Sequence, residues 1–480
     1  MSQDLSNKHL EDWNQRVLLA ETALGIIGSL FRRSSIVTMM YGRPLIENAP
    51  IDILRAHRWV RKITDCELSI RDSFPLLEQL NGMKLRPCRI DLGKLGVNWI
   101  KAGKPDVASF VTEQMRASEE LPEQVLEKPQ DIVLYGFGRI GRLLARLLIE
   151  RAGSGTILRL RAIVVRKGAE GDLYKRANLL RRDSVHGRFT GSIQVDEENN
   201  ALIANGHFIK IIYSNAPEEV DYTAHGIHDA IVIDNTGKWR DEAGLNRHIQ
   251  AKGVAKAVLT APGKGDIKNV VFGVNDNVIT QDDKIISAAS CTTNAITPVL
   301  RAVMDRFGIA GGHVETVHSY TNDQNLIDNY HPKVRRGRAA GLNMVITETG
   351  AAKAVAKAIP ELAGKLTGNA IRVPTPNVSL AILNLTLEKE TTVEEVNAYL
   401  RECSLMSSMA QQIDYTTSTE VSSTDLVGSR YAGIVDSAAT IVNDNRCVLY
   451  VWYDNEFGYS MQVVRVTQKM AGVNYVTLPS

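Results

Sequence analysis

The stretch that decides the fold is residues 131–150, DIVLYGFGRIGRLLARLLIE, in a chain of 480 residues. DIVLY is a short apolar run, Gly136, Gly138 and Gly141 follow with GxGxxG spacing, and RLLARLLIE has the apolar pattern of a helix. The first glycine permits a tight turn, the second lets a pyrophosphate approach the backbone, and the third lets helix and strand pack closely. The stretch therefore predicts a dinucleotide site at the positive end of a helix, with an incidental glycine-rich turn as the alternative.

Further apolar runs on the C-terminal side of this stretch predict more strands of the same sheet. The next run, residues 156–165, lies within the length of one βαβ unit. Three more follow: DAIVIDNTG (229–237), KAVLTAPG (256–263) and KIISAAS (284–290). Strands that alternate with helices predict an α/β Rossmann domain with a mostly parallel sheet. After residue 291 a helical stretch leads into longer β-rich segments, including SLAILNLTLEK, whose core-facing residues the pattern leaves unassigned.

On the N-terminal side, residues 1–127 are predicted to be mainly helical. Seven apolar residues recur at steps of three and four: Leu10, Trp13, Val17, Ala20, Leu24, Ile27 and Phe31. This stripe is typical of a helix packed on its neighbours, and pairing with another subunit or protein is the alternative. Residues 117–130, ASEELPEQVLEKPQ, are charged, contain two prolines and predict a linker.

Composition excludes several classes of function. Lys plus Arg (56) nearly balance Asp plus Glu (54), so charge suggests neither a nucleic-acid nor a membrane-surface partner. The five cysteines have no CxxC spacing, which argues against a structural zinc site or disulfide scaffold and suits a reducing compartment. The first residues do not have the pattern of a signal peptide, and no apolar run is long enough to span a bilayer. We expect a cytoplasmic protein without a metal.

The second strand bears on the choice of cofactor. Such strands normally end in an acid that binds the adenosine ribose, but here Val164 and Val165 are followed by Arg166 and Lys167. Basic groups attract a 2′-phosphate, which a carboxylate would repel. The sequence thus favours NADP over NAD; if both basic groups are merely solvated loop residues, this preference disappears.

A cysteine and a histidine suggest covalent chemistry. Cys291 follows the strand KIISAA and opens an apolar helical run, where the helix macrodipole favours a thiolate. His318 lies at the end of an alternating strand and is a candidate base for that thiol. The alternative to covalent chemistry is that Cys291 is a small buried core residue and His318 a structural histidine.

Five segments carry a family resemblance: SCTTN (290–294), HSYTNDQ (318–324), ETGAAKA (348–354), GKLTGNAIRVPTPNVS (364–379) and WYDNEFGYS (452–460). They closely resemble glyceraldehyde-3-phosphate dehydrogenases of the phosphorylating type, from about residue 132 to the C-terminus. The resemblance implies a Rossmann domain over 128–290 with 454–480, and an α+β catalytic domain over 291–453 with a mainly antiparallel sheet. Residues 1–127 would then form an additional helical domain of unknown role.

The resemblance also implies roles for individual residues. Cys291 would add to the aldehyde, and His318 would accept the hydroxyl proton as hydride leaves. Substrate and inorganic phosphate would be bound by Ser290, Thr292, Thr321, Arg336, Thr349, Gly350 and Arg372. The cofactor would be bound, besides the three glycines, by Arg139, Ile140, Arg166, Lys167, Asn235, Thr236, Gly237, Asn455 and Tyr459. Relatives are homotetramers, so the same assembly is expected, with a protein partner for residues 1–127 as a further possibility.

Departures from the family pattern concern the cofactor and the substrate. Tyr135 stands where the family usually has Asn, Val165 where it has an acid, and Asn329-Tyr330 where NAD-specific members commonly have Leu-Pro. The last two changes are losses of NAD-type features and favour NADP, which would suit a gluconeogenic role, with dual use of NAD and NADP as an alternative. DNYHP resembles a stretch of erythrose-4-phosphate dehydrogenases, which is the rival activity. A non-catalytic interaction protein is the rival of another class.

Overall fold

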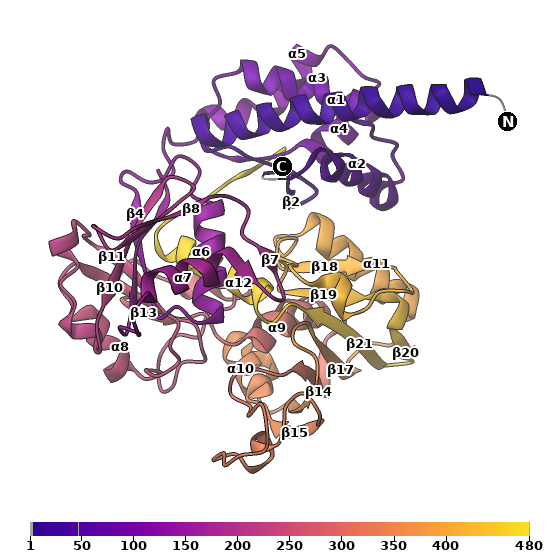
Figure 1. The fold of residues 1–480 in the computed structure, drawn as a ribbon. Coiled ribbons are helices and arrows are strands. Elements are labelled where there is room, and N and C mark those ends of the chain that lie inside the picture. Colours follow the sequence, from indigo (N-terminus) through magenta and orange to yellow (C-terminus); the bar gives the residue numbers. More distant parts are fainter. Residues whose placement is uncertain (1–2, 47, 480) are drawn as a thin grey trace. The chain divides into compact units, whose positions relative to one another are not determined.

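The computed structural model describes residues 3–46 and 48–479, and the chain divides into two compact units (Figure 1). The first unit contains residues 1–129, together with the short segments 152–157 and 473–480. The second contains residues 130–151 and 158–472. The sequence assigned residues 454–480 as a whole to the Rossmann domain, whereas the last of them belong to the first unit.

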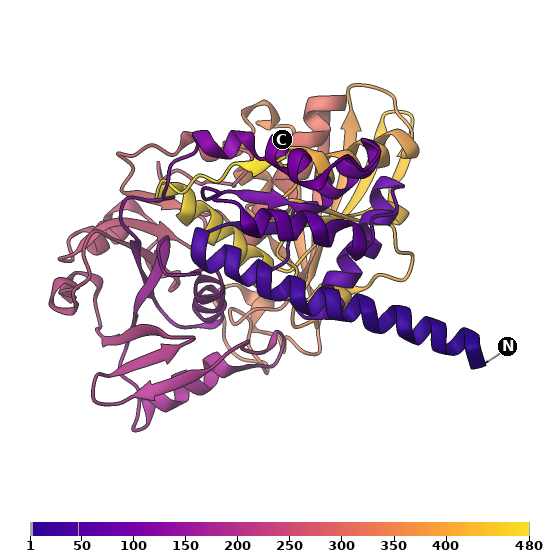
Figure 2. The ribbon, with the colours of Figure 1, turned by 90° about the horizontal axis from the view of Figure 1, so that it is seen from above.

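The first unit is mainly helical, as predicted. Its helices are α1 (Gln3–Ser34), α2 (Pro50–Thr64), α3 (Ile70–Gly82), α4 (Leu92–Lys101), α5 (Val107–Gln114) and the 3-10 turn η1 (Arg116–Glu120). The apolar stripe of α1 is buried only in its C-terminal half, where Ala20, Ile27 and Phe31 pack in the core of the unit. Leu10 and Trp13 continue the stripe but are 59% and 39% exposed, because the N-terminal half of α1 extends past the other helices (Figure 2).

A small sheet in the first unit joins both ends of the chain. Its strands are β1 (Val37–Met40), β2 (Arg43–Pro44), β3 (Arg89–Asp91) and β22 (Thr477–Leu478), in the order β2-β1-β3-β22. Strand β22 pairs with β3 in parallel, with Thr477 opposite Arg89. The C-terminal segment therefore completes a sheet that the N-terminal residues begin.

The second unit opens with the Rossmann sheet, whose order is β13-β12-β11-β4-β5-β10-β9-β8. The six parallel strands are β4 (Gln130–Tyr135), β5 (Leu158–Val165), β10 (His207–Tyr213), β11 (Ala230–Asp234), β12 (Val254–Leu259) and β13 (Ile285–Ser287). Two antiparallel strands, β9 (Ala201–Ala204) and β8 (Ile193–Asp196), extend one edge. The helices of this part are α6 (Arg139–Glu150), α7 (Asp172–Arg181) and α8 (Glu242–Ile249), and β6 (Arg182–Asp183) pairs with β7 (Gly187–Arg188). The predicted parallel sheet is confirmed.

A second sheet follows, in the order β15-β16-β14-β17-β21-β19-β18, with β20 beside β21. Its strands are β14 (Ile309–Ser319), β15 (Val345–Glu348), β16 (Leu366–Val373), β17 (Ser379–Leu387), β18 (Ile413–Thr416), β19 (Gly433–Asp436), β20 (Ile441–Asn443) and β21 (Arg446–Tyr453). The pairs β14–β16 and β18–β19 are parallel, and the other pairs are antiparallel. The helices of this part are α9 (Cys291–Phe307), α10 (Ala351–Ala358), α11 (Val393–Met406) and α12 (Phe457–Met470).

The second sheet buries one face against α9. Along β17, every second residue from Ser379 to Leu387 is buried, which settles the facing that the sequence left unassigned. Ile296, Val299 and Leu300 of α9 belong to the same apolar core. This packing fixes the start of α9 relative to the ends of β14 and β21.

Two features are absent from the described residues. None of the helices in residues 3–46 and 48–479 combines the length and apolar character that crossing a membrane requires. Within the same part of the chain, no group of three or more His, Cys, Asp and Glu side chains is arranged to hold a metal ion.

Candidate active site

Cys291 is the first residue of α9. Ser290 caps this helix, and its hydroxyl accepts the N–H of Thr293 at 3.1 Å. The same hydroxyl lies 2.7 Å from the Thr293 hydroxyl. The cap holds the thiol at the helix N-terminus, where the partial positive charge of the helix is greatest.

His318 is brought to the thiol by β14, the strand that follows α9. Its Nε2 lies 3.5 Å from Sγ of Cys291, and its Nδ1 lies 2.7 Å from the carbonyl oxygen of Ser319. The Ser319 carbonyl can only accept and favours a proton on Nδ1, whereas the guanidinium of Arg372 beside the same nitrogen can only donate. The tautomer with its proton on Nδ1 is the one in which Nε2 can take the thiol proton. The structure therefore brings together the two residues that the sequence singled out.

Arg372 is the third member of this group. It lies on β16 directly opposite His318 in the parallel ladder. Its Nη1 donates to the carbonyl oxygen of Ser319 at 3.1 Å and lies 2.8 Å from Nδ1 of His318. A permanent positive charge is thus in contact with the ring of the candidate base.

Burial controls the protonation of the pair. It raises the pKa of the Cys291 thiol, although the charge of Arg372 and hydrogen bonds from Thr292 act in the opposite direction. Burial and the charge of Arg372 lower the pKa of His318 to about 3, against the hydrogen bond to Ser319. Both shifts favour the uncharged forms, a neutral thiol and a neutral imidazole, whereas the helix N-terminus favours the thiolate.

Tyr453 is a residue that sequence reasoning missed. Its hydroxyl lies 3.0 Å from the hydroxyl of Thr292 and 2.7 Å from that of Thr316, and its ring meets the His318 ring edge to face at 6.0 Å. Burial raises its pKa, so the phenol keeps its proton. The sequence feature that could have pointed to Tyr453 is its position two residues before Asn455, at the end of β21.

Three further residues expected to bind anions are Arg336, Thr349 and Gly350. Gly350 caps α10, and the Thr349 hydroxyl accepts the N–H of Ala351 at 3.2 Å, so this pair forms a helix N-terminus. Arg336 forms an ion pair with Asp323. The buried Nε–H groups of Arg336 and Arg372 have no hydrogen-bond partner among the described residues. Two guanidinium donors without acceptors suit a ligand that brings its own oxygens.

Thr321, the other expected phosphate ligand, follows β14 directly. It is half-buried, and its carbonyl oxygen accepts the N–H of Gln324 at 2.9 Å. Thr321 is therefore in the turn that leaves the sheet three residues after His318.

The glycine motif has the geometry that its spacing predicts. Gly136 has a φ of +97°, which favours glycine, and a Cβ on Gly141 would lie 2.5 Å from the carbonyl oxygen of Gly136. A Cβ on Gly138 would meet nothing within 4 Å, and no side chain caps α6 at this residue. The first turn of α6 thus offers free N–H groups beside open space, as a pyrophosphate requires.

The loop after β11 closes the other side of the glycine motif. Asn235 donates to the carbonyl oxygen of Gly136 at 3.4 Å, and its own buried Oδ1 has no partner among the described residues. Thr236 donates to Asp234 through both its N–H and its hydroxyl, each at 2.7 Å, and Gly237 follows with a φ of +63°. The residues present therefore fit a dinucleotide.

Arg166 and Lys167 are exposed directly after β5. The N–H of Gly136 donates to the carbonyl oxygen of Val164 at 2.9 Å, so the end of β5 lies beside the glycine motif. Lys167 lies 6.0 Å from the ring centre of Tyr213. Both basic groups are therefore at the edge of the sheet where an adenosine ribose is bound in this fold.

Of the remaining expected cofactor residues, Asn455, Tyr459 and Arg139 make hydrogen bonds or ion pairs within the chain. Asn455 is buried, and its Oδ1 accepts the hydroxyl of Ser379 at 2.8 Å. The hydroxyl of Tyr459 donates to the carbonyl oxygen of Ala289 at 2.9 Å. Ile140 is half-buried in the first turn of α6, and the Arg139 side chain forms ion pairs with Asp183 and Glu456.

A Rossmann sheet with a phosphate-binding turn, joined to a sheet that sets a histidine against a helix-start cysteine, defines a two-domain dehydrogenase that binds a nicotinamide dinucleotide. Residues 130–242 match the family model for the NAD binding domain of glyceraldehyde 3-phosphate dehydrogenase, and residues 290–455 match the model for its C-terminal domain. The chain belongs to the glyceraldehyde-3-phosphate dehydrogenase family.

Comparison with curated relatives separates two kinds of family member. A glyceraldehyde-3-phosphate dehydrogenase-like protein of Pseudomonas aeruginosa is 60% identical over 457 residues, which cover 95% of this chain and 99% of the relative. The glyceraldehyde-3-phosphate dehydrogenase of Zymomonas mobilis is 40% identical and covers 71% of this chain and 98% of the relative. A chloroplastic glyceraldehyde-3-phosphate dehydrogenase of Arabidopsis thaliana is 40% identical over 76% of this chain and 89% of the relative. The length of the first match means that most of the N-terminal unit is shared with the Pseudomonas protein.

Proposed function

We propose that the protein oxidises glyceraldehyde 3-phosphate to 1,3-bisphosphoglycerate, reversibly, through a covalent bond to Cys291. The observation that carries the proposal is the 3.5 Å approach of Sγ to Nε2 of His318, with the guanidinium of Arg372 in contact with the same ring. A nucleophile, its base and an anion ligand are then within reach of one small substrate.

The chemistry follows from the neutral resting pair. Sulfur adds to the aldehyde carbon while the thiol proton passes through His318 to the carbonyl oxygen, which gives a hemithioacetal. A bound nicotinamide dinucleotide supplies a hydride acceptor. His318 takes the hydroxyl proton as the C–H bond breaks, and a thioester to Cys291 remains. An oxygen of inorganic phosphate attacks the thioester carbon, the C–S bond breaks, and the acyl phosphate is released as sulfur regains a proton.

Arg372 couples substrate binding to the strength of the base. In the free protein its charge helps to hold the pKa of His318 near 3. When the phosphate of the substrate binds Arg372, the two opposite charges offset each other, and His318 becomes easier to protonate. The base is therefore strengthened only when a phosphorylated substrate is present, which favours glyceraldehyde 3-phosphate over unphosphorylated aldehydes.

The attacking phosphate needs an anion site of its own. The N-terminus of α10 at Thr349 and Gly350 offers N–H groups and a hydroxyl, and Arg336 supplies a buried donor without a partner. This arrangement supports phosphorolysis rather than hydrolysis of the thioester. Because an erythrose-4-phosphate dehydrogenase releases its product with water, we assign the three-carbon substrate.

For the cofactor we assign NADP in preference to NAD, with activity in the gluconeogenic direction. Val165 leaves the end of β5 without an acid, and the exposed Arg166 and Lys167 follow it. A 2′-phosphate at this edge would be attracted by two positive charges, and the end of β5 carries no negative charge to repel it.

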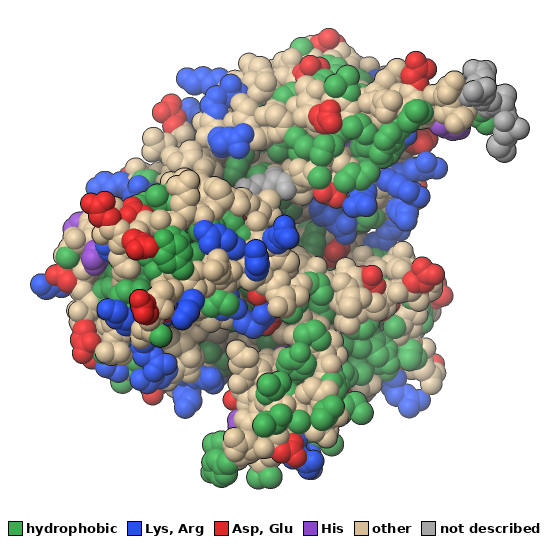
Figure 3. Space-filling model, viewed as in Figure 1, with side chains coloured by type: hydrophobic (Ala, Val, Ile, Leu, Met, Phe, Trp, Pro, Cys, Tyr) green, Lys and Arg blue, Asp and Glu red, His purple; other side chains and the backbone are tan. Residues whose placement is uncertain are grey.

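We also assign a homotetramer. The segment around β15 exposes seven apolar side chains to between 53% and 86%: Leu326, Ile327, Tyr330, Val334, Leu342, Met344 and Ile346. Apolar side chains gather over this segment in Figure 3 as well. An apolar surface of this extent is typical of an interface between subunits. Sedimentation of the full chain measures the assembly, and a monomer would refute it.

The activity is tested with purified full-length protein, glyceraldehyde 3-phosphate, and NAD or NADP, with and without inorganic phosphate. We expect reduction of NADP that requires phosphate and is abolished in Cys291→Ser, while dinucleotide binding remains. Parallel reactions with erythrose 4-phosphate test the rival activity. Phosphate-independent turnover of erythrose 4-phosphate would refute the assignment of substrate, and activity in Cys291→Ser would refute the nucleophile. Absence of turnover with either aldehyde would favour a non-catalytic role.

A further inference from the structure

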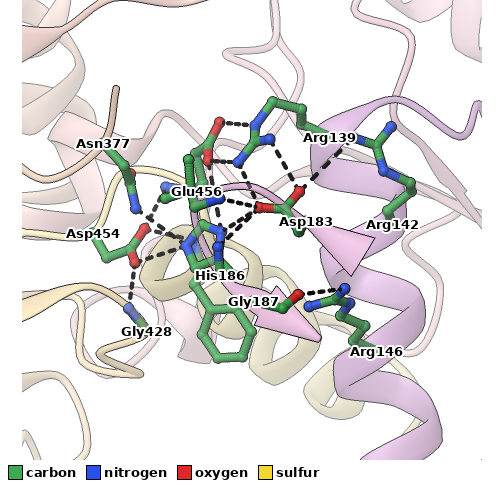
Figure 4. A network of polar contacts seen from close by, with 12 residues as sticks. Arg139, Arg142, Arg146, Asp183, His186, Gly187, Asn377, Gly428, Asp454 and Glu456 are labelled. Atoms are coloured by element: carbon green, nitrogen blue, oxygen red, sulfur yellow. Dashed lines mark hydrogen bonds and ion pairs between the residues drawn. The ribbon is translucent and has the colours of Figure 1, made fainter. Parts of the chain in front are cut away.

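A buried group of charged side chains surrounds His186, in the short loop between β6 and β7 (Figure 4). Nε2 of His186 lies 3.0 Å from a carboxylate oxygen of Asp454. Its Nδ1 lies 3.4 Å from Asp183 and 3.9 Å from Glu456. The His186 side chain is only 2% exposed, and its ring stacks on Phe457. No step of the chemistry above uses this histidine.

Two of the acids bracket Asn455, the residue expected to hold the nicotinamide carboxamide. One oxygen of Asp454 accepts the N–H groups of Glu456 and Phe457, at 3.0 and 2.8 Å. The other accepts the N–H of Gly428 at 2.8 Å as well as the His186 contact. Burial would raise the pKa of Asp454, but its hydrogen bonds with His186 and with the N–H of Gly428 lower it, so the acid stays ionised. The turn that presents Asn455 is therefore built around one buried carboxylate.

The other side of the group reaches the pyrophosphate end of the dinucleotide site. Arg139, the first residue of α6, forms ion pairs with Glu456 and with Asp183, the latter at 3.0 Å. Asp183 in turn accepts the N–H groups of Val185 and His186, at 3.0 and 2.9 Å. Burial would raise the pKa of Asp183, but these N–H groups and Arg139 lower it to about 2.

We propose that His186 is a positioning residue for the cofactor: its backbone N–H donates to Asp183, beside the start of α6, and its ring contacts Asp454 in the turn that carries Asn455. This inference rests on the proposed function, because it assumes that Asn455 contacts the nicotinamide. The link holds the two ends of the dinucleotide site at a fixed separation. His186 acts through Asp454 and touches neither substrate nor cofactor.

The test compares two ligands on the full-length protein. One is whichever of NAD and NADP binds more tightly, and the other is the matching ADP-ribose, which lacks the nicotinamide. We expect His186→Ala to weaken the dinucleotide about tenfold and to leave ADP-ribose binding unchanged, because only the Asn455 turn is released. Titration calorimetry measures both affinities. His186→Gln, whose amide can still donate to Asp454, should restore most of the loss.

A matched control removes a buried histidine outside this group. His57 of α2 is also buried and lies 2.6 Å from the Ser73 hydroxyl and 2.8 Å from the carbonyl oxygen of Ile53. His57→Ala should lower the melting temperature without changing either affinity. In His186→Ala, equal weakening of both ligands, or of neither, would overturn the inference.

The two proposals can fail separately. If the wild-type protein binds a dinucleotide but oxidises no aldehyde, the proposed function falls, and the comparison of ligands still decides the role of His186. A wild-type protein that binds neither NAD nor NADP would overturn both.

Discussion

Replacing His318 with asparagine tests the base directly, because asparagine fills similar space but cannot accept a proton at neutral pH. In the wild-type protein the thiol proton moves across 3.5 Å to Nε2, and the low pKa of His318 keeps the ring unprotonated throughout the neutral range. In His318→Asn only the fraction of Cys291 that is already thiolate can add to the aldehyde. Burial raises the pKa of Cys291 above the ordinary thiol value of about 8.5, so at most about 3% is thiolate at pH 7.

Addition should therefore slow by at least about 30-fold, and loss of the proton acceptor in the hydride step should bring the total to roughly 10²–10⁴. Stopped-flow absorbance of the reduced nicotinamide measures this rate in a single turnover. The rate of His318→Asn should rise about tenfold per pH unit as more thiolate forms, whereas the wild-type rate should be nearly flat. A variant with a flat profile and a rate close to wild type would show that His318 is not the base. Unchanged dinucleotide affinity serves as the control for folding.

Three further results are expected. As pH falls below 6.5, a histidine in the unfolded chain takes up a proton, whereas buried His318 stays unprotonated down to about pH 3. The wild-type protein should therefore lose up to about 1.4 kcal/mol of unfolding free energy per pH unit more than His318→Asn, measured by urea titration. Equal losses in the two proteins would contradict this. Neutral replacements of Arg166 and Lys167 should weaken NADP about tenfold more than NAD in calorimetry, and equal weakening would remove the charge argument. Gly141→Ala places a Cβ 2.5 Å from a carbonyl oxygen, so it should lower the free energy of unfolding in urea by about 1–3 kcal/mol and abolish dinucleotide binding. The control Gly25→Ala, in open space on α1, should stabilise the protein slightly. A stable Gly141→Ala variant that still binds the dinucleotide would refute the packing role.

Much of the second unit could be predicted because its signals are local. The glycine spacing at residues 136–141 fixes a turn, and the helix after residue 291 places a cysteine at its own N-terminus. The approach of His318 to Cys291 could be expected only from the family resemblance, since it depends on the pairing of β14 with β16 and on the packing of α9. The resting protonation state could not be predicted at all, because burial, which opposes both charges, is a property of the folded site.

Other features were invisible in the sequence because they join distant segments. His186 and Asp454 are 268 positions apart. His186 lies in none of the quoted motifs, and the motif that contains Asp454, WYDNEFGYS, indicated no contact with it. Tyr453 is bonded to hydroxyls on two other elements, Thr292 of α9 and Thr316 of β14. The apolar stripe of α1 correctly predicted a helix, but it could not indicate that Leu10 and Trp13 lie beyond the residues that bury the rest of the stripe.

The pairing of β22 with β3 has a consequence for how the protein is made. During translation, residues 89–91 emerge roughly 400 residues before their partner strand, which amounts to about 20–80 s at 5–20 residues per second. For that interval one edge of β3 has no neighbour, and an unpaired edge invites association with other chains. The sheet of the N-terminal unit is therefore complete only after residues 477–478 have been synthesised, and until then the nascent unit exposes an edge that a chaperone could protect.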